Sequence, residues 1–130
     1  MKVVKWKDKY SVGNPLMDAH HRQFLNVVHE LDQAVSSENQ DINKEAILTF
    51  LIDYLDMHLR AEERLMAKID FPGAKAHKAT HHEFENKILE IERAYRKDSA
   101  SLKMDNLLEL AQEWLITHIL KEDKKYEPYV

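Results

Sequence analysis

Residues 51–69, LIDYLDMHLRAEERLMAKI, decide the fold class of this chain. Apolar residues recur through the stretch at alternating steps of four and three, which is the spacing of one face of an α-helix. His58 and Glu62 occupy two positions of this face that packing would normally give to leucine or isoleucine. The stretch therefore predicts an amphipathic helix whose apolar face carries two ionisable side chains.

Three further segments have the same periodicity, and histidine interrupts the apolar face of each. The three faces are Met17, His21, Phe24, Val28, Leu31 and Val35; His77, His81, Phe84, Ile88, Ile91 and Tyr95; and Met104, Leu108, Ala111, Leu115 and His118. With the first stretch, they predict helices over about residues 16–35, 43–69, 74–96 and 101–120.

Polar and helix-breaking residues separate these segments. The polar stretch 36–40 ends the first helix, and Asn43 is the predicted N-cap of the second. Phe71-Pro72-Gly73 ends the second helix, with glycine expected to supply the reversal, and Ser99 or Ser101 is expected to cap the fourth. Four helices with short connections predict an all-α, antiparallel up-down-up-down four-helix bundle, one domain over residues 1–130. Residues 1–15 lack clear periodicity and are expected to form an extended N-terminal arm.

Composition excludes several classes of function. The chain has no cysteine, so disulfides, thiolate metal sites and cysteine nucleophiles are ruled out. The net charge is only -4 and lysines alternate with acids, so no nucleic-acid or membrane partner is indicated. With no apolar leader or membrane-length segment, we expect a cytoplasmic protein, and its mixed surface charge is compatible with a monomer. The sequence does not indicate a protein partner.

The histidines on the apolar faces need a physical explanation. One histidine on such a face is more often a hydrogen-bonded core residue than a metal ligand. Here five histidines and a glutamate interrupt four faces, and burying an unpaired carboxylate alone costs several kcal/mol. Domains have only about 5–15 kcal/mol of net stability, so these groups must satisfy one another, and a bound metal does this most completely. His20, His29 and His82 lie off the apolar faces, where we expect surface positions, although His20 and His82 adjoin candidate ligands.

Local spacings agree with metal binding. His58 and Glu62 are four residues apart, as are His77 and His81, so each pair projects from one side of its helix. The H-E-x-x-H motif of zinc proteases is absent, and the Glu-x-x-His pairs of carboxylate-rich di-iron bundles do not fit either.

Several motifs resemble those of the hemerythrins, and the single-domain bacterial type is the most similar. These motifs are MDAHH (17–21), HLRAEE (58–63), FP (71–72) followed by HKATH (77–81), and WLITHI (114–119) followed by Asp123. The resemblance covers nearly the whole chain, including Trp6 and residues 11–13. There are two departures: His20 stands where the family usually has glutamine, and Asn14-Pro15-Leu16 alters the approach to the first helix.

The resemblance implies two iron ions joined by a bridging oxide or hydroxide. It places His77, His81 and His118 on one iron and His21 and His58 on the other, with Glu62 and Asp123 bridging them. Periodicity alone does not select Asp123, which lies five residues after His118, so the helix is expected to end or loosen there. The resemblance also implies a dioxygen pocket, whose walls would be Leu59, Phe84, Trp114, Leu115 and Ile119.

Counting ligands leaves one open coordination position, on the iron that has two histidines, for dioxygen. The implied function is reversible dioxygen binding for storage, delivery or scavenging, without enzymatic turnover. Two alternatives stay open: a module that senses oxygen or iron and acts on a partner protein, and a di-iron enzyme that handles peroxide or nitric oxide.

Overall fold

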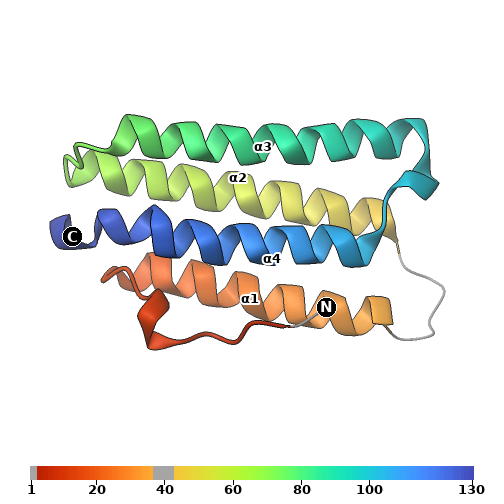
Figure 1. Cartoon of the computed structure of the whole chain (residues 1–130), viewed down its shortest axis with the longest axis horizontal. Helices are drawn as coiled ribbons and strands as arrows, with labels where there is room; N and C mark the ends of the chain where they lie inside the picture. Colours follow the sequence, from red (N-terminus) through yellow and green to blue (C-terminus); the bar gives the residue numbers. More distant parts are fainter. Residues whose placement is uncertain (1–2, 37–42) are drawn as a thin grey trace. The chain divides into compact units, whose positions relative to one another are not determined.

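The computed structural model describes residues 3–36 and 43–130, and every regular element in these two ranges is a helix (Figure 1). The long helices are α1 (Pro15–Ser36), α2 (Lys44–Lys68), α3 (Ala74–Lys97) and α4 (Met104–Lys121). Four short 3-10 helices accompany them: η1 (Asp8–Tyr10), η2 (Ser99–Ser101), η3 (Asp123–Lys125) and η4 (Glu127–Tyr129). None of the four long helices is both long enough and apolar enough to cross a bilayer, among the residues described.

The described residues form two units, each built on one pair of helices. The terminal unit comprises residues 3–36 and 104–130, and the central unit comprises residues 43–103. In the terminal unit α1 packs against α4, and the two helices run in opposite directions (Figure 1). The predicted apolar face of α4 is buried, with Leu108 and Leu115 at most 2% exposed. That of α1 is buried from Met17 to Val28 but only half-buried at Leu31 and Val35.

The N-terminal arm is fixed to the terminal unit by hydrogen bonds to side chains of α1 and α4. The Asp18 carboxylate accepts hydrogen bonds from the Ser11 hydroxyl (2.6 Å) and the Val12 backbone N–H (2.9 Å). Further along the arm, the Val4 N–H donates to the amide oxygen of the buried Gln112 (2.9 Å). An arm without periodicity is thus ordered because polar side chains of the helices bind its backbone.

In the central unit α2 and α3 form an antiparallel helical hairpin (Figure 1). As predicted, Asn43 caps α2, and its side chain accepts a hydrogen bond from the Ala46 N–H (3.0 Å). Lys44 donates to the carbonyl oxygens of Ser99 (3.2 Å) and Leu102 (2.9 Å), which ties the start of α2 to the segment after α3.

The turn between α2 and α3 differs from the expected one. Asp70, with φ of 52°, provides the left-handed residue after α2, whereas Gly73 has φ of -87° and ψ of 9°. Glycine is needed at residue 73 for space, because a Cβ atom there would lie 2.8 Å from the Phe71 ring. The prediction that glycine supplies the reversal was therefore wrong, and aspartate, which tolerates this conformation, takes that role.

The start of the fourth helix also differs from the prediction. Ser99–Ser101 form the short helix η2, and the Asp98 side chain caps it by accepting from the Ala100 N–H (3.1 Å). The serines therefore do not cap α4, which begins at Met104. The polar residues 37–40 predicted to follow the first helix lie outside the described residues, as do residues 1 and 2 of the arm.

Burial of Tyr54 on α2 predicts a dependence of stability on pH. Loss of solvation raises the pKa of the Tyr54 phenol to about 12, whereas the unfolded chain releases this proton at about 10. Between these values the folded state binds more protons, so the free energy of unfolding falls as pH rises. We expect a loss of roughly 1–2 kcal/mol from this residue between pH 9.5 and 11.5, because solvent screens part of the effect.

Urea denaturation of the parent chain and of Tyr54→Phe at both pH values measures this contribution. The variant should lose less stability over the interval. An identical loss in both proteins would contradict the assignment to Tyr54.

Candidate metal centre

The central unit brings a carboxylate of α2 against two imidazoles of α3. Glu62 Oε1 lies 2.9 Å from His77 Nε2 and 3.0 Å from His81 Nε2. Glu62 and His81 are fully buried, and His77 is 2% exposed. Because His77 and His81 are one helical turn apart, their rings reach the same carboxylate oxygen, and they meet edge to face at 4.7 Å between centroids.

The second oxygen of Glu62 faces a different imidazole. Glu62 Oε2 lies 3.9 Å from Nε2 of His58, which is one turn earlier on α2 and 3% exposed. This separation is too long for a hydrogen bond. Glu62 therefore presents one oxygen to the two histidines of α3 and the other to the histidine of its own helix.

The terminal unit repeats this arrangement around Asp123. Asp123 Oδ1 lies 2.9 Å from His118 Nε2, and Asp123 Oδ2 lies 3.4 Å from His21 Nε2. Asp123 and His21 are fully buried, and His118 is 5% exposed. Again the two oxygens of one carboxylate point toward two different imidazoles.

A change of helix type places Asp123 beside His118. Helix α4 ends at Lys121, the Glu122 N–H closes a last bond to the His118 carbonyl (2.8 Å), and the 3-10 helix η3 starts at Asp123. In a continued α-helix, a residue five positions on would be turned well away from His118. The expectation that the helix ends before Asp123 is confirmed.

These buried groups fit a metal ion chemically. The donor atoms are imidazole Nε2 atoms and carboxylate oxygens, a set that suits iron and also manganese, cobalt or zinc. Two ligand atoms bound about 2.1 Å from one ion at a right angle lie about 3 Å apart. The nitrogen–oxygen distances of 2.9 and 3.0 Å within the central unit and 2.9 Å within the terminal unit agree with that separation.

The histidines off the apolar faces are placed differently. His29 and His82 are exposed, and His20 is half-buried. His29 Nε2 lies 3.1 Å from the Gln33 amide nitrogen, on the surface of α1. Helical periodicity thus separates the buried histidines from the accessible ones.

Four of the five residues expected to wall a dioxygen pocket are apolar and buried. Leu59 and Phe84 belong to the central unit, and Leu115 and Ile119 to the terminal unit, and none is more than 2% exposed. Trp114 is half-buried, and its ring stacks on His118 with centroids 4.4 Å apart and planes inclined by 15°. The indole therefore covers one face of a candidate ligand.

Sequence reasoning did not select Glu63, which contacts a candidate ligand directly. Its carboxylate oxygen Oε2 lies 2.8 Å from Nδ1 of His81. Glu63 follows Glu62, so it projects about 100° away from the apolar face that guided the prediction. The contact forms only when α2 packs against α3, so the sequence alone does not show it. An acidic residue next to a candidate ligand could nevertheless have suggested a role in orienting a second ligand.

The sequence matches a known protein family over most of its length. Residues 12–130 match the family described as Hemerythrin HHE cation binding domain. A bacteriohemerythrin of Methylococcus capsulatus is 31% identical over 130 residues, covering 98% of this chain and 97% of the relative. A hemerythrin-like protein of Naegleria gruberi is 30% identical over 124 residues, covering 94% of this chain and 89% of the relative.

Solved structures give the same result for the fold. A crystal structure of wild-type hemerythrin superposes with a TM-score of 0.83 at 27% identity, covering 98% of this chain and 97% of the other. A hemerythrin mutant superposes with a TM-score of 0.84, also at 27% identity. The fold is therefore an all-helical four-helix bundle, and the described residues contain no strand, as the sequence predicted.

Occupation of these clusters by metal should stabilise the fold. An ion at 1,000 times its Kd contributes about 4 kcal/mol if it binds only the folded chain. For a domain of this size that raises Tm by about 10 °C or more. Thermal unfolding followed by circular dichroism, with Fe²⁺ under anaerobic conditions and then with excess chelator, measures the difference.

Mg²⁺ is the matched control, because it prefers oxygen ligands and should raise Tm little. Equal Tm values with Fe²⁺ and with chelator would contradict metal binding by these residues.

Proposed function

Because the chain belongs to the hemerythrin family, we propose that its buried histidines and carboxylates hold two iron ions that bind dioxygen reversibly. The ligands of one iron are His77, His81 and His118, and those of the other are His21 and His58. Glu62 and Asp123 would supply the two carboxylates that help to hold these ions.

The main support for this assignment is the orientation of the two carboxylates. In each of them, the two oxygens face different imidazoles. Glu62 turns Oε1 toward His77 and His81 and Oε2 toward His58. Asp123 turns Oδ1 toward His118 and Oδ2 toward His21. A carboxylate that binds one ion through each oxygen needs this orientation, and both units supply it independently.

When bound, a pair of ferrous ions would supply a reversible two-electron exchange with dioxygen. The protein ligands influence whether dioxygen binding stays reversible. Five neutral imidazoles and only two carboxylates stabilise high-valent iron less than a carboxylate-rich site does, so irreversible oxidation is disfavoured.

The apolar residues near the ligands protect the same exchange. Leu59, Phe84, Leu115 and Ile119 are buried, and Trp114 lies over His118. As walls of a dioxygen pocket, they would keep water and protons away from the bound ligand. This supports a binding protein for storage, delivery or scavenging of dioxygen over an enzyme with turnover.

Reversible oxygenation is the direct test. Reduced, iron-loaded protein should develop a visible absorption band in air, and the band should disappear under vacuum over repeated cycles. The spectrum should saturate at two irons per chain by metal analysis. Colour that never reverses, or full colour at one iron per chain, would argue against a carrier, and turnover of hydrogen peroxide or nitric oxide would favour the enzyme.

Iron retention in single histidine variants tests the ligand assignment. His118→Ala removes an assigned ligand, so it should lose bound iron and the oxygenation spectrum. His29→Ala is the matched control on an exposed helix surface and should retain two irons per chain. Metal analysis after gel filtration distinguishes them, and equal iron contents would be incompatible with the assignment.

A further inference from the structure

His81 has a carboxylate at each of its ring nitrogens, and only one of them belongs to the proposed ligand set. Nε2 lies 3.0 Å from Glu62 Oε1, and Nδ1 lies 2.8 Å from Glu63 Oε2. We propose that Glu63 is a positioning residue that holds the proton of His81 on Nδ1 and so keeps Nε2 available for a metal ion. This inference rests on the proposed metal centre and extends it to a residue outside the seven ligands.

The chemistry of imidazole explains why such a residue is useful. A neutral imidazole carries a proton on one nitrogen and a lone pair on the other, and only the lone pair binds metal. Without an acceptor at Nδ1, the proton can occupy either nitrogen and the ring can turn about its side-chain bonds. An acceptor at 2.8 Å fixes both the tautomer and the ring orientation.

Glu63 is itself held in place by a charged partner. Arg60, one turn earlier on α2, donates from Nη2 to Glu63 Oε2 at 3.1 Å and also to Glu85 of α3. The Glu63 side chain is only 12% exposed, so solvent weakens its interactions little. A chain of contacts therefore runs from α3 to α2 and back to the imidazole on α3, in the order Glu85, Arg60, Glu63, His81.

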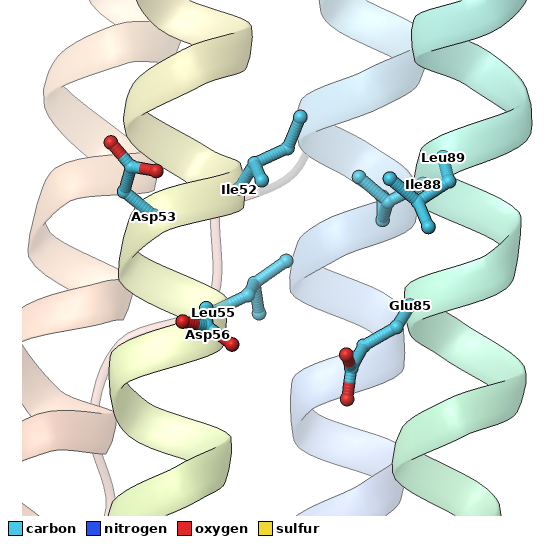
Figure 2. Close-up of a pocket in the computed structure, with 7 residues that line it drawn as sticks. All are labelled: Ile52, Asp53, Leu55, Asp56, Glu85, Ile88 and Leu89. Carbon is cyan, nitrogen blue, oxygen red and sulfur yellow. The ribbon is translucent and has the colours of Figure 1, made fainter.

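The outer end of this network lies at a solvent-accessible pocket between α2 and α3 (Figure 2). The pocket has a volume of about 250 Å³, and Glu85 is one of its lining residues. Arg60 and Glu85 are 34% and 25% exposed, whereas His81 is fully buried. The Arg60–Glu85 pair thus anchors Glu63 from the side of the helix pair that is open to water.

A simpler role for Glu63 would be an ion pair with Arg60 that stabilises the hairpin and does nothing for His81. The two roles differ in what the Glu63 carboxylate must provide. Stabilising the ion pair requires negative charge, whereas positioning His81 requires only a hydrogen-bond acceptor. Glu63→Gln removes the charge and keeps an acceptor, while Glu63→Leu removes both.

Zn²⁺ is the probe, because it suits the same donors and leaves NMR signals sharp. Chelator competition on the full chain should show Zn²⁺ affinity reduced about 10–100-fold in Glu63→Leu. Glu63→Gln should stay within about threefold of the parent chain, since its amide oxygen still accepts the hydrogen bond. Glu83→Gln, an exposed change of the same type on α3, is the control and should have no effect.

The His81 ring protons in ¹⁵N-labelled, Zn²⁺-loaded protein provide the second readout. The parent chain should show a slowly exchanging Nδ1–H. That signal should move upfield in Glu63→Gln, because a neutral acceptor forms a weaker hydrogen bond than a carboxylate, and it should be lost by exchange in Glu63→Leu. If Glu63→Leu does not fold, the chemical shift of the His81 Nδ1–H in Glu63→Gln is by itself enough to test the positioning role.

The outcomes separate this inference from the function on which it rests. A parent chain that binds no Zn²⁺ would overturn the metal centre itself. Parent and Glu63→Leu proteins that bind equally well would overturn the positioning role alone. Weaker binding in both Glu63 variants with an unchanged Nδ1–H signal would identify Glu63 as only an ion-pair partner of Arg60.

Discussion

The carboxylates of Glu62 and Asp123 are fully buried, and the structure around them must compensate for the loss of their hydration. An isolated carboxylate in such surroundings costs more than a domain of this size can spare, so each needs cationic or hydrogen-bonding neighbours. In each unit these neighbours are imidazoles, which lie within 4 Å of the Glu62 or Asp123 oxygens. Bound metal ions would neutralise the remaining negative charge of the two carboxylates. Buried carboxylates surrounded by imidazoles are therefore typical of metal sites.

Different local structures place the two carboxylates. Glu62 lies inside a regular helix, where one turn brings His58 alongside and the antiparallel partner α3 presents two more imidazoles. Asp123 depends on the end of α4 and the start of η3. A continuous α-helix could not have presented both His118 and Asp123 to a common point. The irregular C-terminal segment is therefore as necessary to the site as the long helices are.

Sequence patterns predicted the helices well and their ends less well. Periodicity located four helices, and Asn43 was identified as a cap, because both signals depend on residues close in the chain. The turn at Asp70 was missed because the nearby Gly73 is a stronger candidate for the left-handed position, and the cap at Asp98 was missed because several polar residues follow one another there. Similarly, Leu65 lies three residues after Glu62, which places it on the predicted apolar face, yet it is only half-buried, whereas Met66 is fully buried.

Helical spacing was enough to predict the fold class and to select five histidines and one glutamate as candidate ligands, because it fixes which side chains share a face. Asp123 came from family resemblance, since no local period reaches across a change of helix type. The packed helices were needed to show which oxygen of each carboxylate faces which imidazole, and that Glu63 contacts both His81 and Arg60. These contacts join helices through side chains far apart in the chain, so their geometry exists only once the helices pack.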